Sequence, residues 1–240
     1  MRNAKTNTKT NITPQKRDSR ARLAPTVLVI FSLTILAWAS LRANAAWHFF
    51  AAESITGQMY EAKVFTPEGI DRAAAHLGKS LARFPNNPDY LDLRGYLREQ
   101  QAGLPGVVGR QRRDLLESAA EDYRSALAVR PLWPYSWANL LSVKDKLGQV
   151  DSEFNSAINR AAETGPWEPR VQLQIVRSGL RYWDELRRPT RALVQAKMAD
   201  ALRVQPREAF VIARFYGRPD LVCGLDTNQP QIKRWCESVL

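Results

Sequence analysis

The feature that most constrains this chain is an uninterrupted apolar stretch close to its N-terminus. Residues 23–41 read LAPTVLVIFSLTILAWASL and contain no charged side chain. As an α-helix, with about 1.5 Å of rise per residue, this stretch spans roughly 28 Å, which matches the hydrocarbon core of a bilayer. Pro25 falls in the first turn, where the missing N–H costs little. The stretch therefore predicts a transmembrane helix over residues 23–42 that anchors the chain as a single-pass membrane protein.

Basic residues lie almost entirely on one side of this stretch. Seven Lys and Arg side chains precede it within residues 1–22, whereas only Arg42 follows closely. The positive-inside rule then places the N-terminus in the cytoplasm and the bulk of the chain across the membrane. Residues 1–22 hold almost no apolar side chains, so we predict a disordered basic tail that contacts lipid headgroups.

A cleaved signal peptide is the alternative interpretation of the same stretch. Ala43, Asn44 and Ala45 offer a small-x-small cleavage site. The apolar region of a signal peptide usually covers about 7–15 residues, which is shorter than the stretch found here. The length therefore favours a retained anchor, and both interpretations send the remaining chain to the same compartment.

The net charge of +11 has a topological meaning rather than a nucleic-acid one. Residues 1–22 hold seven basic residues and one acidic residue, and so carry more than half of the net charge. The rest of the chain mixes both signs, as a solvated protein surface does. We therefore expect no nucleic-acid partner.

The two cysteines, Cys223 and Cys236, lie thirteen positions apart near the C-terminus. Outside the cytoplasm such an isolated pair predicts one disulfide, whose loop closure contributes roughly 3 kcal/mol to stability. A metal site is disfavoured, because the two histidines, His48 and His76, are far away in sequence. Two unpaired buried thiols are the remaining alternative.

Beyond the anchor the sequence predicts an all-α domain built from helix pairs. Ala119, Tyr123, Ala126 and Pro131 have the spacing of the second helix of a tetratricopeptide repeat, in which small residues permit close packing and Pro ends the helix. A weaker copy begins at Ala73, and a later one ends at Pro206. Trp137 and Leu140 lie three residues apart, as on a repeat's first helix.

These patterns divide the chain into five parts. After the tail and the anchor, we predict a membrane-proximal segment over residues 43–66 and a TPR-like antiparallel helical-repeat domain, a solenoid, over residues 67–222. Residues 223–240 form a C-terminal cap closed by the disulfide. A long helix starting near Val171 is expected to carry an apolar stripe consisting of Leu173, Val176, Leu180 and Trp183.

A glycine-rich insertion, GLPGVVGRQRR over residues 103–113, lengthens the first pair and is predicted to form a loop. Insertions in repeat proteins often lie on the binding face. Arg110, Arg112 and Arg113 end this segment, and their forked donors suit the carboxylates of acidic sugars or of a partner protein. The alternative is a solvated basic loop end without a ligand.

Tryptophans at the predicted repeat joints form a second candidate site. Trp133 and Trp167 are expected to be partly exposed, whereas Trp137 and Trp183 are expected to belong to the core. An exposed Trp ring can stack on a sugar ring or anchor a protein partner.

No enzymatic motif is present in the sequence. It contains no GxSxG, HExxH or phosphate-binding loop, and two histidines leave little room for acid–base catalysis by histidine. The glycines at 103, 106 and 109 lie outside any strand–helix context. We therefore predict a non-enzymatic protein without catalytic residues, cofactor or metal.

Residues 130–140, RPLWPYSWANL, are followed by a glycine turn, a helix and then GPWEPRVQLQ at residues 165–174. This region, with the basic N-terminus, the single span and the repeat-like remainder, resembles the VpsP-type proteins encoded among bacterial exopolysaccharide biosynthesis genes. The resemblance implies a role in making or exporting a surface polysaccharide at the inner membrane of a Gram-negative bacterium. It supplies no established catalytic residues.

Two functions follow as hypotheses. The leading one is a periplasmic adaptor or scaffold that binds other envelope proteins of a polysaccharide assembly or export system on its helical surface. The alternative is direct binding of the acidic polysaccharide through Arg and Trp side chains. A groove rich in Arg and Trp would favour the polysaccharide, and an apolar groove would favour a protein.

Overall fold

The computed structural model describes residues 19–225 and 229–238, and this described part of the chain contains helices and no strand. The chain divides into two compact units, with the boundary between Asn44 and Ala45. Helix α1, Ser19–Glu61, contributes to both units. Predicted features within residues 1–18, which include most of the basic tail, lie outside the described residues.

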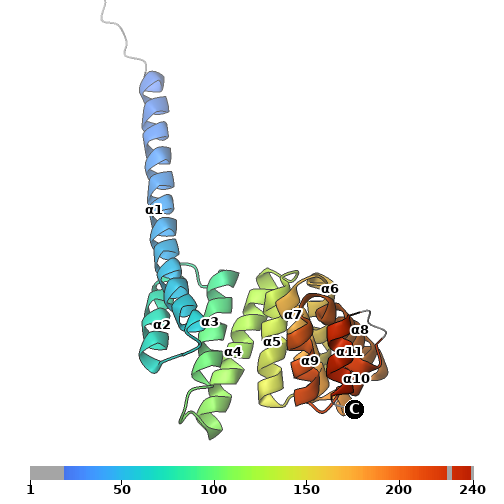
Figure 1. The fold of residues 1–240 in the computed structure, drawn as a ribbon. Helices are drawn as coiled ribbons and strands as arrows, with labels where there is room; N and C mark the ends of the chain where they lie inside the picture. Colours follow the sequence, from blue (N-terminus) through green and yellow to red (C-terminus); the bar gives the residue numbers. More distant parts are fainter. Residues whose placement is uncertain (1–18, 226–228, 239–240) are drawn as a thin grey trace, which may run out of the picture. The chain divides into compact units, whose positions relative to one another are not determined.

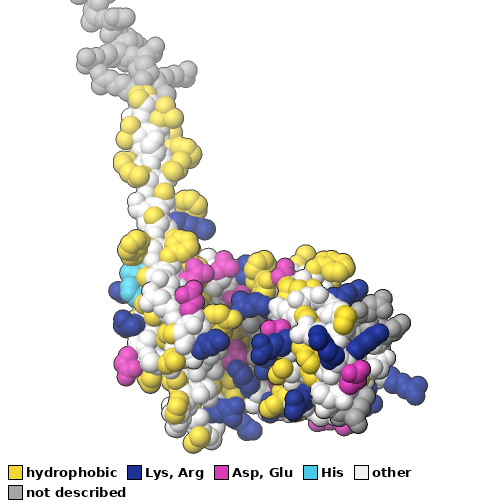
Figure 2. All heavy atoms as spheres, viewed as in Figure 1, with side chains coloured by type: hydrophobic (Ala, Val, Ile, Leu, Met, Phe, Trp, Pro, Cys, Tyr) yellow, Lys and Arg dark blue, Asp and Glu magenta, His cyan; other side chains and the backbone are white. Residues whose placement is uncertain are grey.

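The N-terminal part of α1 is apolar and exposed. Its large side chains between Val27 and Leu41 are all exposed, and hydrophobic side chains cover this part of the helix on the face shown in Figure 2. Thr34 and Ser40 donate their hydroxyl protons to the carbonyls of Phe31 and Leu36, so their polar groups are satisfied within the helix. Among the described residues, α1 is the one helix long and apolar enough to cross a membrane.

The second unit, residues 45–240, is built from short helices that follow one another in chain order (Figure 1). They are α2 (Pro67–Leu81), α3 (Pro88–Gln101), α4 (Gly109–Val129), α5 (Pro134–Leu147), α6 (Ser152–Thr164), α7 (Pro169–Arg181), the 3-10 helix η1 (Trp183–Glu185), α8 (Arg188–Val204), α9 (Pro206–Phe215), α10 (Asp220–Cys223) and α11 (Pro230–Glu237).

Local sequence explains where many of these helices begin. Seven of the described helices, including α3, α5 and α7, have Pro in their first turn, where its fixed φ suits the helix. Thr66, Asn87 and Asp151 cap α2, α3 and α6 by accepting hydrogen bonds from backbone N–H groups of the first turn. Gly148 ends α5 in a left-handed conformation.

Helices α3 and α4 pack antiparallel and at close range. On α3 and α4, Arg94 pairs with Asp122, and Arg98 reaches both Asp122 and the carbonyl of Ser118. Ala119, Tyr123 and Ala126 are fully buried on α4, as the small–aromatic–small spacing predicts. The Tyr123 ring lies over Gly95, where an added Cβ would be 2.8 Å from the ring. The small residue on α3 is therefore what admits the aromatic residue on α4.

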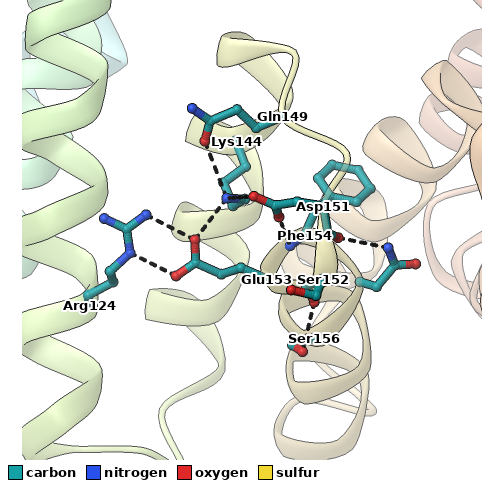
Figure 3. A network of polar contacts seen from close by, with 9 residues as sticks. Arg124, Lys144, Gln149, Asp151, Ser152, Glu153, Phe154 and Ser156 are labelled. Carbon is teal, nitrogen blue, oxygen red and sulfur yellow. Dashed lines mark hydrogen bonds and ion pairs between the residues drawn. The ribbon is translucent and has the colours of Figure 1, made fainter.

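Buried charged side chains connect successive helices, and nearly all of their polar atoms form hydrogen bonds or ion pairs. Lys144 on α5 is 1% exposed, and its ammonium donates to Gln149, Asp151 and Glu153. Glu153 also accepts two hydrogen bonds from Arg124 on α4, so one network joins α4, α5 and α6 (Figure 3). These contacts hold the pKa of Glu153 down at about 2, chiefly through the hydrogen bonds from Arg124.

Three sequence predictions are refined by the structure. The glycine-rich segment predicted as a loop over residues 103–113 becomes helical at Gly109, because α4 extends over the three arginines. The helix predicted from Val171 ends at Arg181, and Trp183 lies in η1. Its buried stripe contains Ile175, Val176 and Leu180, whereas Leu173 is only partly buried.

The predicted disulfide between Cys223 and Cys236 is confirmed, and it joins α10 to α11 with 5.6 Å between the two Cα atoms. Ile232, which precedes the second cysteine on α11, is buried in the main apolar cluster with Val222. Of the turn residues between the cysteines, Asp226 and Asn228 lie outside the described residues. The crosslink therefore closes the C-terminal end of the core.

Candidate functional site: a groove lined by four helices

The largest cavity of the helical unit is an open groove of about 1020 Å³. Its walls are one face each of α1, α3, α5 and α7, with further residues from the α1–α2 and α4–α5 turns. On every helix the lining residues, some of them adjacent in sequence, recur at intervals of three, four or seven positions, which places them on one face. The groove is thus the shared polar face of helices α1, α3, α5 and α7. Its lining residues include Phe49, Glu53, Tyr60, Asp92, Tyr96, Glu99, Tyr135, Asn139, Ser142, Lys146, Arg170, Gln174 and Arg177.

The wall formed by α3 is acidic, but its carboxylates are bonded within the protein. Glu99 is 5% exposed and accepts hydrogen bonds from Tyr123, Ser142 and Lys146. Asp92 accepts from Ser136 and from Arg130, which also pairs with Asp89. These contacts compensate only part of the negative charge of the wall, and they fix α3 against α4 and α5.

Burial dominates the electrostatics of this wall. It raises the pKa of Asp92, although the hydrogen bond from Ser136 and the charge of Arg130 oppose the shift. It also raises the pKa of Tyr96 to about 12, with a smaller contribution from the charge of Glu99. Tyr96 therefore remains a neutral hydrogen-bond donor at any physiological pH.

The wall formed by α7 is basic, and its charges have no acidic partner among the described residues. Arg170, Gln174 and Arg177 lie at i, i+4 and i+7 on the groove face of α7. Arg170 donates a hydrogen bond of 3.1 Å to the hydroxyl of Tyr60 and lies over its ring at 5.3 Å. No carboxylate of a described residue pairs with Arg170 or Arg177. This wall can therefore receive the carboxylates of a ligand.

Aromatic rings surround the mouth of the groove. The guanidinium of Arg130 lies 4.3 Å from the centre of the Trp133 ring, which is itself 5.5 Å from the Tyr135 ring. The Tyr135 hydroxyl donates to Glu168, and this hydrogen bond is the main reason that the pKa of Tyr135 is raised. Flat, partly exposed rings of this kind can stack on a sugar or hold an apolar side chain.

The structure separates the two candidate sites predicted from the sequence. Arg110, Arg112 and Arg113 lie in the first turns of α4 and are exposed, with the Arg110 side chain 93% exposed and 4.0 Å from Asp114. Trp133 follows the other end of α4, a helix about 30 Å long at 1.5 Å per residue. One small ligand cannot contact both.

Of the two predicted tryptophans, Trp133 lines the groove and Trp167 does not. Trp133 is 39% exposed, whereas Trp167, in the turn between α6 and α7, is 81% exposed. The sequence analysis missed Arg170, Arg177 and Tyr60. The alternation of apolar Val171, Ile175 and Val176 with polar residues on α7 would have revealed the arginine stripe, but not that three other helices face it.

Metal ions in proteins are held by clusters of His, Cys, Asp and Glu side chains. No group of three or more His, Cys, Asp or Glu side chains is placed to hold a metal ion among residues 19–225 and 229–238. His48 and His76 do meet, with their Nδ1 atoms 3.2 Å apart, on α1 and α2 away from the groove lining.

No protein-family model matches this sequence, and no curated protein matches it either. The function is therefore inferred from the residues of the groove and of the apolar helix.

Proposed function

We propose that this protein is a membrane-anchored, non-enzymatic adaptor that binds a segment of another envelope protein in the groove. It serves a bacterial system that makes or exports a surface polysaccharide. Helix α1 crosses the inner membrane with the N-terminus in the cytoplasm, and the helical domain lies in the periplasm.

The groove is neither apolar throughout nor dominated by Arg and Trp, and this mixed chemistry is the observation that carries the proposal. Its lining holds five basic and four acidic side chains beside apolar ones such as Phe49, Phe65 and Leu93. A uniformly anionic polymer would meet the carboxylates of α3, whereas a protein segment carries both charges and apolar side chains. Charge complementarity of this kind sets specificity and orientation in protein complexes.

A TPR-like arrangement accounts for the position of the groove. In a stack of helix pairs the first helices of successive pairs share one surface, and that surface commonly binds partners. The groove is lined by the odd-numbered helices, and Tyr123 on α4 packs over Gly95 on α3 as a second helix packs over a first. Resemblance to the VpsP-type proteins supplies the link to polysaccharide.

The proposed compartment is supported by two independent features. Seven basic residues precede the apolar stretch, which favours a cytoplasmic N-terminus. The Cys223–Cys236 disulfide favours an oxidising compartment for the other end of the chain.

Direct binding of an acidic polysaccharide is the second candidate. It is favoured by Arg170 and Arg177, which pair with no described carboxylate, and by the rings of Tyr60, Trp133 and Tyr135 at the mouth of the groove. Arginine binds carboxylates with two parallel hydrogen bonds, and aromatic faces stack on sugars. Under this function the polymer would run along α7 rather than α3.

Photo-crosslinking in intact cells tests the two functions. The full chain carries p-benzoylphenylalanine in place of Asn139, inside the groove, or in place of exposed Val108 as the control position. We expect a discrete protein adduct from position 139 alone, and we expect Arg170→Ala with Arg177→Ala to abolish it. Arg112→Ala with Arg113→Ala removes the same charge at the far end of α4 and should leave the adduct intact.

A polydisperse, glycosidase-sensitive adduct from position 139 would instead establish the polysaccharide function. Equal adducts from positions 139 and 108, unaffected by the α7 substitutions, would contradict both functions of the groove.

A further inference from the structure

The exposed tryptophans of the helical unit are confined to one edge. Among the described residues of this unit, Trp47, Trp133 and Trp167 are exposed, while Trp137, Trp183 and Trp235 are partly buried. Leu132, which is 76% exposed, lies beside Trp133. Packing does not explain these positions, because the rings of Trp47 and Trp167 lie largely in solvent.

Contacts within the unit show that these residues share an edge. The Ala45 carbonyl of α1 accepts a hydrogen bond from Ser80, near the end of α2, and the Phe49 ring lies 4.9 Å from Tyr90 in the first turn of α3. The start of the domain portion of α1 therefore lies at the α2–α3 joint.

The next two joints continue the same edge. Arg130 of the α4–α5 joint pairs with Asp89 in the first turn of α3. Tyr135 at the start of α5 donates to Glu168 of the α6–α7 joint, and Gly165 of that joint packs against Pro134. The proximal edge, as we call it, comprises residues 45–50 and the α2–α3, α4–α5 and α6–α7 joints.

Chain continuity places residues 45–50 of this edge directly after the apolar stretch. Arg42 is the first charged residue after the apolar stretch, and Trp47 follows it by five positions. At 1.5 Å per residue, Trp47 lies about 8 Å further along α1, which is roughly the depth of one headgroup layer. Residues 45–50 thus cannot be far from the membrane if α1 crosses it.

The side chains of the proximal edge suit a lipid surface. Tryptophan concentrates at the headgroup level, where its apolar ring is buried and its N–H remains hydrated. Basic residues lie there too: Lys79 is in the last turn of α2, and Arg83 follows the end of that helix. Such cations favour anionic headgroups.

We propose that the proximal edge is a lipid-contacting surface, which docks the helical unit on the membrane with Trp47, Leu132 and Trp167 among the headgroups. This inference rests on the proposed membrane anchor, but not on the proposed ligand of the groove. A docked edge limits the motion of the unit and leaves the groove to partners that approach along the membrane surface.

Fluorescence quenching in nanodiscs of phosphatidylethanolamine and phosphatidylglycerol tests the proposal with the full chain. An environment-sensitive dye is attached at Leu132→Cys, with Val108→Cys as the matched control. Val108 is equally apolar and 71% exposed, but it precedes α4, whereas Leu132 follows it. A third label at Trp38→Cys reports on the anchor itself. The quencher is a nitroxide carried by the lipid headgroup.

We expect the label at position 132 to be quenched and blue-shifted, the label at 108 to remain as in water, and Trp167→Ser to reduce the quenching at 132. Quenching at 38 with equal, weak quenching at 132 and 108 would overturn the docked edge while leaving the anchor in place. Absence of quenching at 38 would overturn the anchor, and the docked edge with it.

Discussion

The α3 and α7 walls of the groove differ in what their charges do. On α3, Glu99 and Asp92 are held by hydrogen bonds and ion pairs from α4, α5 and the turn between them. On α7, Arg170 and Arg177 face the same groove without a described carboxylate partner. The first set of charges connects helices, and the second set is available to a ligand. Whether a charged side chain in a groove is available to a ligand therefore depends on its partners within the protein.

The largest test of this comparison is Glu99→Ala. The substitution leaves Lys146 without its ion pair and Tyr123, which is fully buried, without an acceptor. The buried, unsatisfied Tyr123 hydroxyl and the loss of the ion pair of the partly exposed Lys146 together cost about 2–3 kcal/mol. We expect a clear fall in the thermal midpoint measured by circular dichroism on the full chain in detergent. Glu53→Ala is the control, since Glu53 is exposed in the same groove and pairs with no described residue; equal midpoints for the two variants would break the comparison.

The face of α7 that packs against α8, opposite in role to its groove face, provides the next test of the comparison. A Cβ at Gly179 would lie 2.4 Å from Val194 on α8, so Gly179→Ala forces the two helices apart. Overpacking of this kind costs about 1–3 kcal/mol. Gly78→Ala is the matched control, because Gly78 has open space around it in α2 and alanine favours a helix by roughly 0.5–1 kcal/mol. We expect urea unfolding to show a loss for the first variant and none for the second.

The pH dependence of stability distinguishes carboxylates that are ion-paired within the protein from carboxylates that are not. The pKa of Glu153 is lowered from its ordinary value of 4.5 to about 2, mainly by the hydrogen bonds from Arg124. A lowered folded-state pKa stabilises the fold above the unfolded-state value, and the contribution is lost as the pH falls through the folded-state value. The stability difference between the parent chain and Glu153→Gln should therefore be full above about pH 4.5 and shrink toward pH 2. A difference that stays constant over this range would contradict the assigned partners.

The smallest stability effect is expected for Arg170→Ala combined with Arg177→Ala. These side chains are outside the internal ion-pair network, so the unfolding free energy should change by no more than about 0.5 kcal/mol. Ligand capture by the groove should nevertheless be lost, as measured by the crosslink from position 139. A large destabilisation would show that α7 uses its charges as α3 does.

Much of the fold could be predicted from local sequence. Three features act through local physical constraints: the uncharged stretch at 23–41, the prolines that begin helices, and the small–aromatic–small spacing at Ala119, Tyr123 and Ala126. The cysteine pair was predictable for the same reason, since few alternatives exist for two cysteines near one terminus. The candidate site was less predictable: Trp133 was identified, but the arginines chosen with it lie at the far end of α4.

The sequence by itself thus determined the apolar helix, the helical class of the domain and the disulfide, because hydrophobic length, helix breakers and cysteine count act locally. Only the tertiary structure decided the groove and the proximal edge. Each helix has a polar face by its own periodicity, but whether that face is covered, bonded or open depends on which helices pack beside it. Residues 49–60 and 170–177 meet in one groove for that reason alone.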